Sequence, residues 1–368
     1  MAGRKFSKGL TVFACVLALI VGLVAGFFLY AYFTREEGGD VYVSGDISFH
    51  FMELGNKATG DSVYIKAGDT DILIDAGSVA SSTTTTAAYI EQYCTDNVLE
   101  FVIVTHADED HIAGFAGSNS APSMFDRFTC ETIITFDRTN KDTVTQAGNE
   151  TTYGKFVTQL DEAVAAGAKH YTALECYNNE SGAQRTYEVS DGIEMEILYN
   201  YYYEHETDNE NNYSVCLLFS QGDKNFLFTG DLEGEGEEYL VENNDLPEVE
   251  LMKAGHHGSK TSCNDVLLSV VKPKIVCVCC CAGYNQYHAA EENVFPTQAM
   301  VDRVAPYTER VFVTSQVAEN ADGYTSMNGN IVVTSNRDGV TVECSNNNTL
   351  LKDTDWFKQN RRMPAAWQ

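Results

Sequence analysis

The chain has 368 residues, 44% of them hydrophobic, and a formal net charge of −29 at pH 7. The apolar content is enough for a packed core, which excludes an intrinsically disordered protein. The negative charge argues against tight nonspecific binding of nucleic acid, because such binding normally uses a basic surface.

The first predicted element is a membrane-spanning helix at residues 10–33. These 24 residues contain no charged side chain, and about 24 residues at roughly 1.5 Å each are long enough to cross a bilayer. Three basic residues precede the helix, and Glu36 and Glu37 follow it. The positive-inside rule then predicts a single-pass cell-membrane protein with a cytoplasmic N-terminus and an extracytoplasmic domain. A cleaved signal peptide is the alternative, but its apolar region would be shorter.

This prediction divides the chain into five segments. They are a cytoplasmic tail (1–9), a transmembrane signal anchor (10–33), a linker (34–45), a large folded domain (46–350) and a C-terminal tail (351–368). The C-terminal tail mixes basic and aromatic residues, and we expect it to dock only loosely on the domain.

The folded domain begins with strands. Alternating apolar residues predict a strand at 46–52, and the stretches 61–66 and 71–77 predict a hairpin of two further strands. Asp75 lies at the end of the second hairpin strand. A carboxylate at a strand end is commonly a turn former, but open sheets also place functional groups there.

A helix at 84–93 and a buried strand at 99–104 lead into the densest polar stretch of the chain, THADEDHIAGF (105–115). Four potential metal ligands leave the end of that strand in one short loop: His106, Asp108, Asp110 and His111. Imidazole and carboxylate groups beside a hydrophobic strand are costly to bury unless a cation holds them. The stretch therefore predicts a metal site, with a solvated acidic turn as the alternative.

A second polar region follows two more predicted strands. The hairpin 215–229 ends at Gly230-Asp231, so Asp231 also lies at a strand tip. The strand 249–254 runs into HHGSKTS (256–262), where glycines on both sides of the paired histidines allow a close turn about an ion. The lysine and hydroxyl groups of this stretch can hold an anionic oxygen, although a polar turn is the alternative.

The remaining elements complete an α/β domain. We predict strands at 131–136, 193–198, 274–277, 310–314, 330–334 and 340–344, and helices at 154–166 and 296–304. Four of the eleven cysteines crowd the strand-like run IVCVCCCAGY. Neighbours on a strand point to opposite faces, so these four cannot all pair with one another. We predict mostly buried free thiols, since the paired CxxC spacing of a structural zinc site is missing.

The strand tips together supply enough ligands for two divalent ions, and in this combination the sequence resembles the metallo-β-lactamase superfamily. More narrowly, it is similar to the extracytoplasmic hydrolase domain of ComEC-type DNA-uptake competence proteins. The resemblance runs from about residue 46 to 345, and it implies an αββα sandwich of two mixed β-sheets flanked by helices. The residues that carry it are His106-Ala107-Asp108-Glu109-Asp110-His111, Asn211-x-x-Ser214, Thr229-Gly230-Asp231 and His256-His257-Gly258-Ser259-Lys260-Thr261-Ser262.

The resemblance also implies roles for these residues. Two ions, Zn²⁺ or Mn²⁺, would be held by His106, Asp108, Asp110, His111, Asp231 and His256, with His257 as the alternative or additional histidine ligand. Asp110 or a histidine would transfer a proton, His257 and Lys260 would stabilise developing charge, and Asp75 would support the site. Substrate contacts would come from Asn211, Ser214, Ser259, Thr261 and His288. A carboxylate at position 108 favours manganese without excluding zinc.

Two departures from the family pattern stand out. The family often carries Asn-x-Tyr-x-His-Pro near its end, but here Phe295 precedes Pro296, and only His288 is near enough in sequence to replace the missing histidine. The superfamily's middle histidine has no clear counterpart, and His170 and His205 are candidates by residue type alone.

Three functions fit this sequence. The first is a phosphodiesterase, including a nuclease, that meets its substrate outside the cell without binding nucleic acid tightly and nonspecifically. The second is a hydrolase of cell-wall or small-molecule esters, for example of the phosphocholine-esterase kind. The third is a non-catalytic surface module stabilised by metal.

Overall fold

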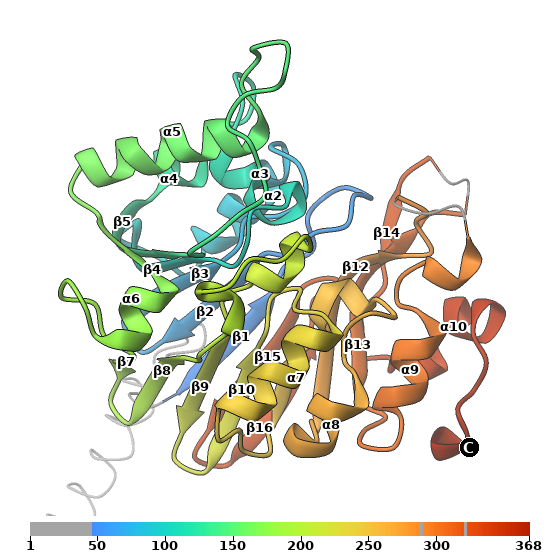
Figure 1. The fold of residues 1–368 in the computed structure, drawn as a ribbon. Helices are drawn as coiled ribbons and strands as arrows, with labels where there is room; N and C mark the ends of the chain where they lie inside the picture. Colours follow the sequence, from blue (N-terminus) through green and yellow to red (C-terminus); the bar gives the residue numbers. More distant parts are fainter. Residues whose placement is uncertain (1–45, 287–289, 320–321) are drawn as a thin grey trace, which may run out of the picture. The chain divides into compact units, whose positions relative to one another are not determined.

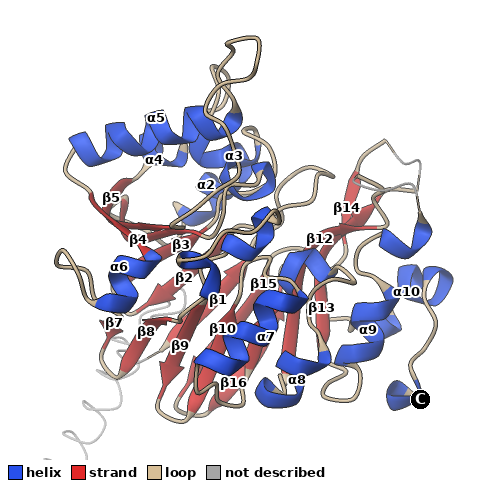
Figure 2. Cartoon of the chain, viewed as in Figure 1, coloured by secondary structure: helices blue, strands red, loops and turns tan. Residues whose placement is uncertain are grey.

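The computed structural model describes residues 46–286, 290–319 and 322–368. These residues form two eight-stranded β-sheets packed face to face, with helices on the outer face of each sheet (Figure 1, Figure 2). The predicted α/β sandwich of two mixed sheets flanked by helices is thereby confirmed.

The predicted membrane segment lies outside the described residues. The cytoplasmic tail (1–9), the transmembrane helix (10–33) and the linker (34–45) therefore stay predictions. Among the residues that the structure does describe, no helix combines the length and the apolar character needed to cross a bilayer.

The first sheet is mixed. It contains β1 (Ile47–Phe51), β2 (Val63–Ala67), β3 (Thr70–Ile74), β4 (Val98–Val104), β5 (Thr129–Thr135), β6 (Lys169–Thr172), β15 (Ile331–Asn336) and β16 (Gly339–Cys344). The strand order is β16-β15-β1-β2-β3-β4-β5-β6. Strands β3 to β6 pair in parallel, and the other pairs are antiparallel.

The second sheet is also mixed. It contains β7 (Thr186–Ser190), β8 (Ile193–Ile197), β9 (Leu217–Gln221), β10 (Lys224–Phe228), β11 (Leu251–Lys253), β12 (Ile275–Ala282), β13 (Val311–Val317) and β14 (Tyr324–Ser326). Its order is β14-β13-β12-β11-β10-β9-β8-β7. Strands β10 to β13 pair in parallel, and the remaining pairs are antiparallel.

Helices cover both outer faces. The first sheet is covered by α2 (Ser82–Ile90), α3 (Glu109–Ala116), α4 (Met124–Arg127) and α5 (Thr152–Ala165), and α6 (Ala173–Asn178) follows β6 (Figure 1). The second sheet is covered by α7 (Gly234–Asn243), α8 (Asp265–Val271) and α9 (Gln298–Val304). Their apolar faces are buried on the sheets, and this burial is the main source of their stability.

Aromatic packing joins the two sheets. The ring of Phe49 in β1 lies 5.6 Å from Phe219, 4.6 Å from Phe226 and 5.5 Å from Phe228 between ring centroids. All five residues of β1 are buried, as expected for a central strand with both faces covered. Each fully buried Phe contributes about 1.5–3 kcal/mol of transfer free energy, so this contact fixes one sheet firmly against the other.

The C-terminal residues differ from the expected loosely docked tail. Leu351, Phe357 and Trp367 are buried in the core outside the second sheet, and Phe357 belongs to α10 (Asp355–Asn360). The indole Nε1 of Trp367 donates a hydrogen bond to the carbonyl of Thr308 at 2.9 Å. Residues 351–368 are therefore packed as part of the domain, because their aromatic side chains bury apolar area. Their position at the end of the sequence does not reveal this packing.

The cysteine-rich run forms a longer strand than the predicted 274–277. All eight residues of β12 are buried, including Cys277 and Cys279–Cys281. Thiols behave as small hydrophobes in such a core. Each of the ten cysteines in the described ranges is a free thiol, which agrees with the prediction.

Strand direction determines where the polar motifs meet. The parallel pair β3 and β4 brings its carboxyl ends together, and the parallel pair β10 and β11 does the same in the second sheet. A backbone hydrogen bond links the segments near the strand ends of the two sheets: Val215 N donates to Thr105 O at 2.9 Å. The strand-tip residues of both sheets therefore lie at one end of the sandwich.

Candidate metal centre

The HADEDH stretch is half loop and half helix, whereas the sequence predicted a loop throughout. Residues 105–108 form the loop, and α3 then begins, so Asp110 and His111 lie in its first turn. Gly114 lets α3 approach the turn after β3, because a Cβ at that position would lie 2.1 Å from the carbonyl oxygen of Ala76. The helix thus holds its two potential ligands against the strand tips.

Asp75 anchors this segment to the first sheet. The carboxylate is 1% exposed and accepts hydrogen bonds from Thr105 N at 2.8 Å and Thr105 Oγ1 at 2.7 Å. Its Oδ2 atom also lies 2.7 Å from Nδ1 of His111. Asp75 therefore orients the His111 ring through Nδ1 and directs Nε2 toward the second sheet.

Two imidazoles and two carboxylates converge between the sheets. Nε2 of His111 and Nε2 of His257 each lie 3.1 Å from Oδ2 of Asp231. Nε2 of His257 is also 3.3 Å from Oδ2 of Asp110. Nitrogen and oxygen donors of this kind are typical ligands of zinc and manganese.

The contacts at Nδ1 of each ring orient its Nε2 atom toward the place where a cation would bind. Nδ1 of His257 lies 3.0 Å from the carbonyl oxygen of Cys279, which can only accept, so this nitrogen carries the hydrogen. In the neutral state, the ring would offer the lone pair of Nε2 to a divalent ion held beside Asp110 and Asp231. Nε2 of His257 faces the two carboxylates, and Nε2 of His106 is buried without a hydrogen-bond partner. This donor set, with the rings oriented from behind, fits a bound divalent ion.

Asp61 is the fourth member of the compact group. One donor atom from each of Asp61, His111, Asp231 and His257 lies within 4.8 Å of the others. However, Asp61 Oδ1 contacts His257 at Nδ1, at 3.1 Å, which is the opposite side of the ring from Nε2. We therefore assign Asp61 to orientation of His257, and Asp110 to the ligand set in its place.

A buried lysine completes the charge arrangement. Lys253 is 2% exposed, and its Nζ lies 2.5 Å from Oδ2 of Asp61 and 3.3 Å from Oδ1 of Asp231. The ammonium also donates to the carbonyls of Gly230 at 3.0 Å and Ala254 at 3.1 Å. No sequence motif points to Asp61 or Lys253. One feature of the sequence could have indicated this pair: Lys253 lies inside the apolar run of β11, where a buried charge requires a partner.

The pKa values follow from these contacts. Burial alone would lower the pKa of His111 and of His257, but Asp231 and the neighbouring carboxylates hold both pKa values well above the ordinary value. Burial alone would raise the pKa of Asp231, but His257, His111 and Lys253 lower it well below its usual range. The carboxylates therefore stay ionised, as metal ligands must be.

His106 and Asp108 form a second, looser arrangement beside this centre. His106 is fully buried, its Nδ1 lies 3.1 Å from Thr105 Oγ1, and its Nε2 lies 3.6 Å from Oδ2 of Asp108. The other carboxylate oxygen of Asp108 forms an ion pair with Lys141. The structure therefore brings four ligands together closely, while the donors for a second ion are fewer and partly engaged.

The paired histidines lie in different surroundings. His256 and His257 have φ angles of 45° and 53°, so two consecutive non-glycine residues adopt the left-handed conformation. Each such residue costs about 1–3 kcal/mol, which is typical of functional sites. His257 enters the metal group. His256, the other candidate ligand, places Nδ1 2.9 Å from Oε1 of Glu233 and 3.1 Å from Oγ1 of Thr261.

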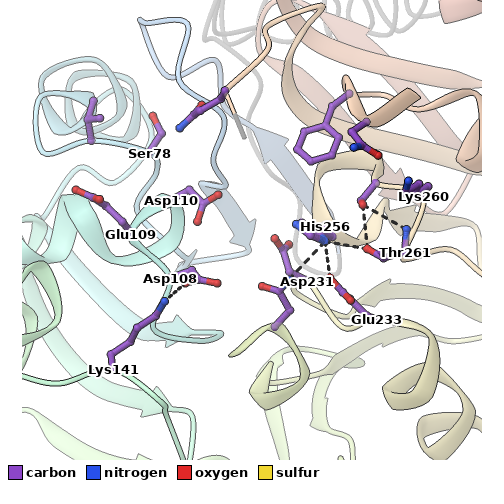
Figure 3. Close-up of a pocket in the computed structure, with 16 residues that line it drawn as sticks. Ser78, Asp108, Glu109, Asp110, Lys141, Asp231, Glu233, His256, Lys260 and Thr261 are labelled. Atoms are coloured by element: carbon purple, nitrogen blue, oxygen red, sulfur yellow. Dashed lines mark hydrogen bonds and ion pairs between the residues drawn. The ribbon is translucent and has the colours of Figure 1, made fainter. Parts of the chain in front are cut away.

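A pocket of about 630 Å³ opens above the centre (Figure 3). Eight predicted site residues line it: Asp108, Asp110, Asn211, Asp231, His256, Ser259, Lys260 and Thr261. Further polar or aromatic groups in the lining had no predicted role: Ser78, Glu109, Lys141, Glu233, Gln286, Asn293 and Phe295. Apart from Glu109 in the HADEDH stretch and Phe295 beside Pro296, they belong to no motif, so only the fold brings them together.

The remaining predicted residues have other positions. Ser214 is buried behind the pocket, where its hydroxyl donates to Asn211 O at 2.7 Å and accepts from Asp231 N at 3.0 Å. It positions Asp231 and does not line the pocket. Glycine is required beside it, because a Cβ at Gly230 would lie 2.7 Å from the Ser214 hydroxyl. His288 lies outside the described residues.

The two candidates for a middle histidine lie outside the metal group. His170 in β6 has its Nε2 2.9 Å from Thr135 Oγ1. His205 is exposed and stacks on the ring of Tyr201 at 3.8 Å. Neither replaces the missing family ligand.

The fold and this centre define the class of the protein. The profile of the metallo-β-lactamase superfamily matches residues 55–118 and 205–282, which include all four converging ligands. The chain therefore contains a metallo-β-lactamase domain. This domain has the fold of a superfamily of metal-dependent hydrolases. Among solved structures it is similar to the metallo-β-lactamase fold protein YhfI from Bacillus subtilis, with 10% identity and a TM-score of 0.41 over 73% of this chain and 95% of the other.

Its curated relatives confirm the narrower resemblance to competence proteins. Over 117 residues it is 30% identical to Recombination protein 2 of Haemophilus influenzae, covering 31% of this chain and 14% of that protein. Over 246 residues it is 26% identical to Competence protein ComA of Neisseria gonorrhoeae, covering 67% of this chain and 28% of that protein. The chain thus matches less than a third of the length of either relative.

Proposed function

We propose that this chain hydrolyses phosphodiester bonds with the help of bound divalent ions. One observation carries the proposal: Nε2 of His111 and of His257 converge with Asp110 and Asp231 at the base of an open pocket. A divalent ion held there supplies Lewis acidity to an ester oxygen and to water. Both zinc and manganese suit this donor set.

The pocket wall provides groups for an anionic substrate. Lys260 lines the pocket with 46% of its side chain exposed, and the hydroxyls of Ser259 and Thr261 lie beside it. A phosphate oxygen can accept hydrogen bonds from all three. Because the chain as a whole is strongly acidic, local positive charge has to hold the substrate, and nucleic acid is expected to bind only weakly outside the pocket.

His256 is placed to act on the leaving group. All of its hydrogen bonds and ion pairs in the described residues involve Nδ1, and the ring lines the pocket. Glu233 is itself held by Asn211 Nδ2 at 2.9 Å and Asn209 Nδ2 at 2.8 Å. A ring anchored at Nδ1 presents Nε2 to the substrate and can donate a proton to a departing oxygen.

A second candidate function also has support in the pocket. Glu109, Glu233 and the ring of Phe295 line it, and carboxylates beside an aromatic ring suit a cationic group such as choline. An ester of the phosphocholine kind is therefore the alternative substrate to a polynucleotide.

One assay separates these candidates. The full-length chain, purified in mild detergent and loaded with Mn²⁺ or Zn²⁺, is tested on single-stranded DNA, bis-p-nitrophenyl phosphate and p-nitrophenyl phosphorylcholine. Diester cleavage that EDTA or Asp110→Ala abolishes supports the proposal, and turnover of phosphorylcholine without DNA cleavage identifies the alternative. Metal binding without turnover of any diester contradicts both and leaves a metal-stabilised surface module.

We further propose that residues 10–33 anchor the enzyme in the membrane with its domain outside the cytoplasm. The uncharged 24-residue run and the basic residues before it support this. Protease treatment of intact cells tests it. Digestion of the domain from the outside agrees with the proposal, and protection until lysis contradicts it.

A further inference from the structure

A short segment after β5 carries a lysine into the pocket. We call residues 137–142 the strap. Glu210, which is 7% exposed, accepts hydrogen bonds from Thr139 Oγ1 at 2.7 Å and from Asn140 N at 2.7 Å. Arg138 Nε also donates to the carbonyl of Tyr203 at 3.2 Å. These contacts fix the strap of the first half of the domain to the second half, and so determine the position of its lysine.

The lysine of the strap pairs with a residue of the HADEDH motif. Lys141 Nζ forms an ion pair with Oδ1 of Asp108 across the pocket wall (Figure 3). The other oxygen of the same carboxylate lies 3.6 Å from Nε2 of His106, which is buried without a hydrogen-bond partner. Asp108 is therefore shared between a cationic side chain and an orphaned imidazole nitrogen.

The two potential ion positions differ in how many donors they offer. At the first, His111, His257, Asp110 and Asp231 converge, whereas the ion pair of the strap lysine Lys141 is with Asp108. The second position has His106 Nε2 and Asp108 as its own donors.

The oxygens that could complete the second position are already engaged. Asp108 is neutralised by Lys141, and Oδ1 of Asp231 lies 3.3 Å from Lys253. An ammonium group is a point charge that cannot coordinate a metal ion, so it competes with one for a carboxylate.

We propose that Lys141 controls occupancy of the second metal position. The chain holds one divalent ion tightly at the first position, and a second ion binds only by displacing the Lys141 ammonium from Asp108. This inference rests on the metal centre of the proposed function. It adds the order in which the two metal positions fill and the residue that sets the affinity for the second ion.

Metal titration tests the inference without relying on activity. The full-length chain is stripped of metal and titrated with Mn²⁺. Calorimetry gives the two affinities, and electron paramagnetic resonance detects the spin-coupled pair that only a doubly occupied centre produces. In the unmodified chain we expect one tight ion and a second, weaker one.

The decisive variant is Lys141→Met, with Lys141→Gln as a second version. Partly exposed ion pairs contribute up to about 1 kcal/mol, which corresponds to about 5-fold in affinity. We therefore expect the second ion to bind about 5-fold tighter, with a smaller effect on the first affinity. Lys260→Met is the matched control, because it removes the same charge from the same pocket without touching Asp108, and we expect less than about a 2-fold change.

Three results would overturn the inference. The first is a pair of equal affinities in the unmodified chain that Lys141→Met does not alter. The second is an equal effect of Lys260→Met, which would mean that only the net charge of the pocket matters. The third is a chain that binds no Mn²⁺ in any version, and this result alone would also remove the metal centre of the proposed function.

Discussion

Replacing Lys253 by methionine should destabilise the metal-free domain strongly. Lys253 is the ammonium that balances Asp61 and Asp231, and all three side chains are at most 2% exposed. Removing one member of a buried pair leaves an uncompensated charge, which costs about 3–5 kcal/mol. A domain of this size changes its melting temperature by about 2–4 °C per kcal/mol, so we expect a decrease of roughly 6–20 °C.

Urea unfolding followed by far-UV circular dichroism measures this cost in EDTA. The matched variant is the double substitution Asp61→Asn with Lys253→Met, which removes both charges of the 2.5 Å pair. It should be more stable than Lys253→Met alone, because no ion is left unpaired. A divalent ion should also restore part of the stability of the single variant by binding beside Asp231.

Two outcomes would refute this reasoning. One is a loss below about 1 kcal/mol for Lys253→Met, which is the range of an exposed pair. The other is a double variant no more stable than the single one, which would show that Lys253 acts through packing and not through its charge.

The other predictions concern the metal ligands and the pocket. His257→Ala should abolish tight binding of the divalent ion in calorimetry. His256→Ala should retain that binding but lower kcat by about 10²–10⁴-fold on diesters with alkoxide leaving groups. Equal loss of metal binding in both variants would contradict the assignment. Asp75→Asn should weaken metal binding by about 10–100-fold, because it misorients His111, and an unchanged affinity would count against this. The raised pKa values of His111 and His257 mean that metal binding displaces protons. Affinity should therefore rise with pH through neutrality, with proton release measurable by calorimetry in two buffers, and a pH-independent affinity would exclude this protonation.

The architecture could be predicted from the sequence because the local patterns of apolar and turn residues match the strands and turns that form. The hairpins at β2–β3, β9–β10 and β15–β16 have short polar turns between apolar runs, and they form where expected. The short edge strands β6, β7 and β14 were not predicted, because a few residues with partial burial leave only a weak alternating pattern.

The motifs that form the site could be predicted from the sequence, but the arrangement of their side chains could not. Asp110, His111 and Asp231 could be found because they follow strands in a dense polar stretch. The distinction between His256 and His257 could not, since it depends on two left-handed backbone conformations that no residue type specifies. Likewise, Lys141 reaches the pocket only because a buried glutamate holds its segment, a contact between positions about 70 residues apart.

The most direct test of the account is the position of the ion itself. A crystal of the chain grown with Mn²⁺ and measured for anomalous scattering should show a peak within about 2.3 Å of Nε2 of His111, Nε2 of His257 and a carboxylate oxygen of Asp231. A strong peak bound by His256 and Glu233, or no peak between the two sheets at saturating Mn²⁺, would contradict it.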